Sequence, residues 1–123
     1  EVTEIIRAVL TGGRMKTVVN VPNTGQIGNL PRGAVVETLG YVSADGVEPL
    51  PSGTLPGVVG SWCRLHLDVM DLTLRAALEG NRDLFVQALC LDPASAGADF
   101  SELPAMAEEL LSANRPWLPR FFA

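Results

Sequence analysis

Few residues of this 123-residue chain combine in a spacing that could do chemistry. Cys63 and His66 lie three positions apart on one face of a predicted helix and could hold a soft metal ion, but two ligands do not make a stable site. A hydrogen-bonded helical histidine is the simpler interpretation. Asp68 and Asp71 have the same spacing and could act as a pair of catalytic carboxylates. Such a pair needs an apolar pocket that raises the pKa of one member, and none is evident, so a solvated helix face is the better explanation. Cys90 is flanked by leucines and is typical of a buried, unreactive thiol.

The most informative segment is the run 18–31, VVNVPNTGQIGNLP, which holds three asparagines and two glycines between strand signals. Such loops keep side-chain amides and bare backbone in a fixed place, and sugar hydroxyls are recognised by amides of this kind. A polar ligand is therefore chemically reasonable. On composition alone the alternative is favoured, in which Asn20, Asn23 and Asn29 satisfy their own turns.

The elements that position this loop can be predicted from periodicity. An apolar face at helical spacing predicts a helix over 3–11, capped by Thr3 and stopped by glycines at 12–13. β-Branched runs predict strands at 15–21 and 34–38, the second extending through 42. A tight turn at 45–46 then predicts a return strand over 47–50.

The rest of the chain reads as helices. Two apolar stripes over 56–79 predict a long central helix packed on more than one side. Asn81 caps a third helix that ends at Asp92, before a proline, and Ser101 caps a fourth that ends near 114. An apolar tail over 117–122 is expected to dock on a groove or on another chain. Strands and helices are segregated, so the predicted fold class is α+β, with helices packed on a small antiparallel sheet.

Composition narrows the function classes. The length fits one domain, and 47% apolar residues suffice for a core. A net charge of −5 with a single lysine argues against nucleic-acid binding, and no apolar run is long enough to span a membrane. Two cysteines 27 apart predict neither a zinc site nor a disulfide framework, so a cytoplasmic location is expected. No leader is evident, and the first residue, Glu1, indicates a processed chain or a piece of a longer one.

The polar loop and the strand after it resemble a signature block of the NAD-dependent family 4 glycoside hydrolases. In that family a run N-x-x-N-x-G-x-I-x-N-L-P is followed by valines and a glutamate. The matching residues here are Asn20, Asn23, Gly25, Ile27, Asn29, Leu30, Pro31, Val35, Val36 and Glu37. The resemblance continues through segments 41–50, 53–56, 76–82, 87–93, 108–111 and 117–119, which is nearly the whole chain.

This resemblance implies that residues 1–123 are the carboxyl-terminal, substrate and assembly domain of such an enzyme, with a fold like the lactate-dehydrogenase carboxyl-terminal domain. Family members carry a Rossmann domain, NAD and a divalent metal, usually manganese, and cleave O-glycosidic bonds by redox-assisted elimination. The glycine-rich dinucleotide loop and the metal-ligand motifs have no match here. Cys63, His66 and Tyr41 therefore take no ligand or base role, and neither cofactor nor catalysis is expected of this chain alone.

The resemblance makes the loop at 20–30 the best candidate for a wall of the sugar pocket. The candidate substrate-binding residues are Asn20, Asn23, Gly25 and Asn29. The implied partners are the missing amino-terminal Rossmann domain, a sugar substrate and further copies of the chain, with no nucleic acid and no membrane.

Departures from the family pattern bear on the substrate. Arg32 and Gly33 replace a usual acidic pair, and Glu48 stands where members often have a polar cation. The segment 91–93 resembles the α-glucosidase and α-galactosidase branch more than the 6-phosphoglycosidase branch. Two alternatives stay open: a standalone binding or oligomerisation module of the same fold, and a fragment of a 2-hydroxyacid dehydrogenase, ranked last because that family lacks the asparagine-rich loop.

Overall fold

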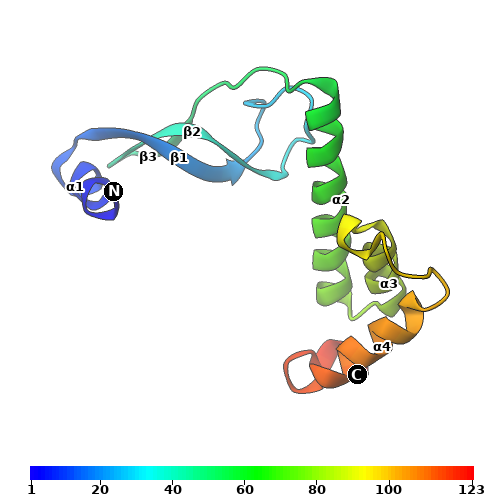
Figure 1. The fold of residues 1–123 in the computed structure, drawn as a ribbon. Helices are drawn as coiled ribbons and strands as arrows, with labels where there is room; N and C mark the ends of the chain where they lie inside the picture. Colours follow the sequence, from blue (N-terminus) through cyan, green and yellow to red (C-terminus); the bar gives the residue numbers. More distant parts are fainter. The chain divides into compact units, whose positions relative to one another are not determined.

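The computed structural model describes all residues 1–123, and the chain divides into two compact units, 1–61 and 62–123 (Figure 1). The sequence favoured a single domain. The division follows the secondary structure, because the first unit contains the three strands and the second unit contains only helices. The α+β class is confirmed, with an antiparallel sheet and separate helices.

The first unit is built on a three-stranded antiparallel sheet in the order β1-β2-β3, formed by β1 (Arg14–Pro22), β2 (Val35–Ser43) and β3 (Gly46–Pro49). The strands agree with the expected ones, although β2 is continuous through Gly40. This position must be glycine, because a Cβ atom would lie 2.7 Å from Val19 Cγ2 on β1. Side chains alternate along β1 and β2, so one face of the sheet is buried.

Helix α1 (Val2–Thr11) contacts β1 and β2. Gly12 ends it in the left-handed conformation at φ 72°, as the sequence indicated. The predicted cap at Thr3 is wrong, since Glu1 is the N-cap residue and makes no side-chain capping bond. The Glu1 carboxylate instead accepts a hydrogen bond of 2.7 Å from the Thr17 hydroxyl on β1, which ties the helix to the sheet.

The second unit packs helices around a core of Ala76, Leu84, Leu111 and Phe121. Its helices are the main part of α2 (Gly57–Glu79), then α3 (Arg82–Leu91) and α4 (Leu103–Ala113). Short 3-10 turns lie at η1 (Pro93–Ser95), η2 (Arg115–Trp117) and η3 (Pro119–Phe122).

Both ends of α3 and the end of α4 at Asn114 agree with the sequence, whereas the start of α4 differs. Asn81 caps α3 by accepting from the Leu84 N–H at 3.1 Å, and Asp92 ends it. Ser101 does not cap α4, whose N-cap is Glu102; its hydroxyl donates to Asp99 instead. The long helix expected over 56–79 is present as α2, but within the second unit Ala76 is its one fully buried residue. Packing of α2 on more than one side stays a prediction for the longer protein.

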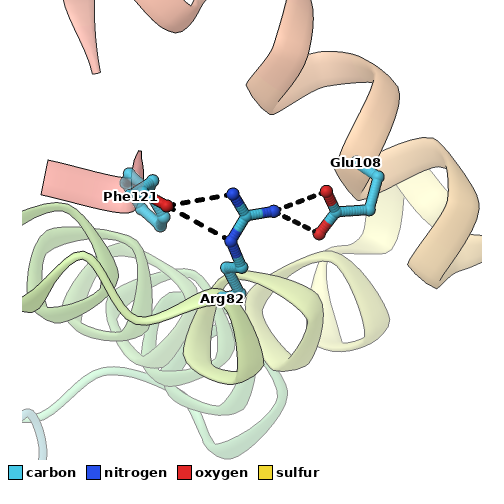
Figure 2. A network of polar contacts seen from close by, with 3 residues as sticks. All are labelled: Arg82, Glu108 and Phe121. Carbon is cyan, nitrogen blue, oxygen red and sulfur yellow. Dashed lines mark hydrogen bonds and ion pairs between the residues drawn. The ribbon is translucent and has the colours of Figure 1, made fainter. Parts of the chain in front are cut away.

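The apolar tail docks within its own chain, where Phe121 belongs to the core and Leu118 and Phe122 pack against it. Phe121 is buried in the core, whereas Trp117 is 76% exposed. Arg82 at the start of α3 fixes the tail, because its guanidinium donates to the Phe121 carbonyl at 2.9 and 3.3 Å and pairs with Glu108 on α4 (Figure 2). None of the helices is long and apolar enough to cross a membrane.

Candidate functional site

The polar loop that follows β1 is organised around Asn23, whose side chain is only 1% exposed. Its amide nitrogen donates to the carbonyls of Ile27 and Leu30, at 2.9 and 3.0 Å, and also contacts that of Pro31. Its oxygen accepts from the N–H groups of Gly25 and Ile27, at 3.1 and 3.2 Å. Every polar atom of this side chain is therefore used inside the loop, as the turn-forming alternative predicted for Asn23. The alternative is wrong for Asn29, whose side chain bonds to the backbone of Leu55.

Backbone bonds close the same loop at its base. The Asn23 N–H donates to the Ala34 carbonyl at 2.7 Å, and the Gly33 N–H donates to the Asn23 carbonyl at 2.8 Å. The Gln26 side chain bridges the Pro22 carbonyl and the Thr24 N–H. Because buried polar groups are costly when unpaired, this closed network holds the loop in one conformation.

A second set of bonds joins the loop to the segment that leads into α2. The Ser52 N–H donates to the Gln26 carbonyl at 2.7 Å, and the Gly28 N–H donates to the Gly53 carbonyl at 2.8 Å. The hydroxyls of Thr38 and Ser52 lie 2.6 Å apart. The loop, β2 and residues 50–55 are thus one connected structure within the first unit.

Asn29 completes the connection by pairing with the backbone of Leu55. Its amide nitrogen donates to the Leu55 carbonyl and its oxygen accepts from the Leu55 N–H, both at 3.0 Å. The Asn29 amide also lies against Gly60 in the first turns of α2, where a Cβ atom would come within 2.7 Å of it. Sequence reasoning did not single out Gly60 or Ser52, because nothing in their local sequence marks a tertiary contact.

The exposed part of the loop carries few polar side chains. Asn20 is exposed on β1 opposite Glu37, and Gly25 is exposed with φ 130°. Arg32 is also exposed, and its guanidinium lies about 3.5 Å from the position of a Cβ atom on Gly25. The structure therefore brings Asn23, Gly25 and Asn29 into one rigid loop, of which Gly25 and the neighbouring Arg32 face solvent.

The cysteine and histidine residues do not form a metal centre. His66 stacks on Trp62 with ring centroids 5.9 Å apart, and Cys63 and Cys90 are both free thiols. No group of three or more His, Cys, Asp or Glu side chains comes together to hold a metal ion. The residues of this chain therefore do not fit the manganese that the family resemblance implies, and no chemical step can be assigned to such an ion here.

Comparison with known proteins places this geometry in a family. The family model described as the family 4 glycosyl hydrolase C-terminal domain matches residues 1–95. An α-galactosidase of Rhizobium meliloti is 32% identical over 97% of the chain and 24% of its own length. An α-galacturonidase of Thermoanaerobacterium saccharolyticum is 42% identical over 72% of the chain and 19% of its own length.

A solved structure gives the same result in three dimensions. The 6-phospho-β-glucosidase of Thermotoga maritima, determined with manganese, NAD⁺ and glucose-6-phosphate, is 30% identical with a TM-score of 0.85. The match covers 95% of this chain and 28% of that one. The chain thus spans about a quarter of the length of such relatives, and it belongs to the family 4 glycosyl hydrolases as their carboxyl-terminal domain.

Proposed function

We propose that this chain supplies a wall of the sugar pocket in a longer glycosidase that uses NAD and manganese, and that it turns over no substrate alone. The observation that carries the proposal is the rigid loop at 23–33, held by Asn23 and Asn29 and joined to the start of α2. Pre-organised loops of this kind hold the groups that orient a ligand.

The residues of the loop divide into two roles under this proposal. Asn23 and Asn29 shape the loop, since their side chains are engaged with its backbone and with Leu55. Asn20, Gly25 and Arg32 are exposed and are the groups that a sugar could meet. Hydride transfer and metal-assisted charge stabilisation, the chemistry that NAD and manganese supply when bound, belong to the part of the enzyme outside these residues.

The substrate proposed for the longer enzyme is an α-glucoside or an α-galactoside. An α-galacturonide is the second candidate substrate. Support comes from the named relatives, which include α-galactosidases, an α-glucosidase and α-galacturonidases. A similar solved structure is that of a 6-phospho-β-glucosidase. A phosphorylated glycoside should therefore be assayed beside the unphosphorylated α-glycosides.

Kinetics of the longer enzyme test the role of the loop. Replacing Asn20 by Ala should raise KM for a nitrophenyl α-glycoside while kcat changes little, because a ground-state contact with the sugar is lost. Glu109→Ala, an exposed change on α4, is the control and should leave both constants unchanged. Identical kcat and KM for N20A and the unmodified enzyme would remove Asn20 from the site.

A standalone binding or oligomerisation module is the second candidate. The exposed apolar side chains Trp62, Met70, Leu74 and Leu78 on α2 favour a role in assembly. The coding sequence upstream of Glu1 separates the two candidates. A Rossmann domain encoded in the same frame supports the glycosidase, whereas a start codon immediately before Glu1 supports the module.

We also propose that the protein works in the cytoplasm as a homo-oligomer. Both cysteines are free thiols, which agrees with a reducing compartment. The exposed apolar residues of α2 and Trp117 provide surface for subunit contact.

A further inference from the structure

Arg32 is the one charged side chain of the polar loop at 23–33. We propose that it makes the pocket favour glycosides that carry an anionic oxygen group, a carboxylate or a phosphate, over the matching neutral glycosides. The inference rests on the proposed function, in which this loop is a wall of the sugar pocket. Residues 50–61, which bond to the loop and begin α2, contain no charged side chain. A sugar at this wall would therefore meet a single positive charge.

The charge of Arg32 is not compensated within the chain. The segment 5–36 contains no Asp or Glu, although the whole chain has 14 of them. Arg32 takes part in no ion pair, hydrogen bond or ring contact. Glu37, the nearest carboxylate along the chain, lies on β2 opposite Asn20. The guanidinium is exposed, so its N–H donors are available to a ligand.

The backbone on both sides of Arg32 is fixed by Asn23. The Asn23 amide nitrogen donates to the Pro31 carbonyl at 3.2 Å, and the Gly33 N–H donates to the Asn23 carbonyl at 2.8 Å. Arg32 and Gly33 form a turn in which Gly33 has φ 85°, a conformation that favours glycine. Because Asn23 is buried, the point from which the Arg32 side chain extends is held in place before a ligand arrives.

The exposed Gly25 lies beside the Arg32 guanidinium. A Cβ atom on Gly25 would stand 3.5 Å from Arg32 Nη1, so bare backbone leaves the guanidinium open on this side. The Gly25 N–H is already bonded to the Asn23 side-chain oxygen at 3.1 Å and cannot serve an anion. Arg32 is therefore the group at this edge of the loop that can bind one.

A guanidinium distinguishes anionic from neutral oxygen groups by the strength of its hydrogen bonds. It can donate to a sugar hydroxyl, but its bonds to an ionised group are about twice as strong. Its planar fork can also meet two oxygens of one carboxylate or phosphate at once. Enclosure of the pocket by the rest of the enzyme would strengthen the attraction further, because it lowers the local dielectric constant.

Kinetics of the longer enzyme test the inference with two matched pairs of nitrophenyl substrates. An α-galacturonide is compared with an α-galactoside, and a 6-phospho-α-glucoside with an α-glucoside. In R32A the ratio of kcat/KM for the anionic member to kcat/KM for the neutral member should fall about tenfold or more in at least one pair, because a charge-assisted contact is lost. The pair that responds identifies a carboxylate or a phosphate as the group bound.

Two further variants show that the effect belongs to the charge at this position. Arg32→Lys keeps the charge and should restore part of the ratio lost in R32A. Arg7→Ala removes an exposed cation on α1 and should leave both ratios unchanged. Unchanged ratios in R32A, including equal losses on both members of each pair, would overturn the inference.

Calorimetry separates a failure of this inference from a failure of the proposed function, because binding of galacturonate, glucose-6-phosphate and galactose needs no turnover. If the longer protein cleaves no glycoside, the proposed function fails, and a greater loss of affinity in R32A for either anionic sugar than for galactose still supports Arg32. Anionic sugars that do not bind, or that lose no more affinity than galactose, then overturn it. If neutral glycosides are cleaved while R32A leaves the ratios unchanged, the proposed function stands and the inference falls.

Discussion

Asn23 shows how a single side chain can determine the shape of a loop. It is almost fully buried and has contacts to five backbone groups, among them the carbonyls of Ile27 and Leu30. No local sequence rule predicts this, because asparagine is equally suited to a turn, a cap and a ligand contact. The position of the loop could be predicted from the sequence. The burial of the Asn23 amide could not, because it depends on contacts with residues up to eight positions away.

Replacing Asn23 by Ala should destabilise the protein strongly. Several buried backbone groups would lose their partners, at about 1–3 kcal/mol for each group left unsatisfied, so the expected loss is at least about 2 kcal/mol. The control is Asn20→Ala, an exposed change expected to stay within about 0.5 kcal/mol. Urea denaturation followed by circular dichroism measures both. Equal midpoints for the two variants would contradict the role given to Asn23.

Asp99 provides a prediction about pH. Hydrogen bonds from the backbone N–H and then the hydroxyl of Ser101 hold the pKa of the Asp99 carboxyl below its ordinary value of 3.8. Its small contribution to stability is present above that value and is lost as the pH falls through the lowered pKa. In an NMR titration, Ser101→Ala should move the Asp99 pKa part of the way back, since the backbone bond remains. An unchanged pKa in S101A would exclude the hydroxyl as a cause.

At the scale of elements, the contact between Asn29 and Gly60 fixes the start of α2. Gly60→Ala would gain about 1 kcal/mol of helix propensity but places a methyl group against the Asn29 amide, which is held at both ends by Leu55. We expect a net loss of stability, whereas Gly57→Ala, with open space around it, should be neutral or stabilising. Thermal unfolding of both variants measures the difference.

A double variant identifies the cause of the Gly60 effect. With Asn29 replaced by Ala, the added methyl group meets no amide, so the cost of Gly60→Ala should disappear and the two changes should be strongly non-additive. Additive losses in N29A/G60A would show that Gly60 is needed for a reason other than this contact.

Arg82 joins three segments of the second unit, and its loss should release the tail. The Arg120–Phe121 bond is a trypsin site that is protected while Phe121 lies in the core. Arg82→Ala removes both bonds to the Phe121 carbonyl and the pair with Glu108, so tryptic cleavage after Arg120 should accelerate. Glu109→Ala, on the same helix as Glu108, is the control. Equal cleavage rates in R82A and the control would show that Arg82 does not hold the tail.

The elements themselves were largely predictable, and their exceptions have physical reasons. Helix α3 could be placed because Asn81 and Asp92 bound it with local chemistry. The caps expected at Thr3 and Ser101 were wrong, because Glu1 and Glu102 begin those helices and Ser101 bonds to Asp99. Apolar stripes on α2 were visible in the sequence, but periodicity does not reveal which stripe finds a partner within the chain.

For the whole molecule, the exposed apolar residues predict self-association of the isolated chain. Trp62, Leu74, Leu78 and Trp117 are each more than half exposed within the second unit. Surfaces of this kind are covered in stable assemblies. Light scattering over a range of concentrations should show a mass above 13.1 kDa that increases with concentration. A monomer at high concentration would contradict this prediction.

We propose that this carboxyl-terminal domain completes a glycosidase whose reactive groups lie in the rest of a longer enzyme. The most direct measurement is nitrophenol release from nitrophenyl α-glycosides, with and without NAD and manganese, by residues 1–123 alone and by the protein extended through its upstream coding sequence. We predict release only by the extended protein, and only with both additions. Release by residues 1–123 alone, or by the extended protein without NAD, would contradict this division of roles.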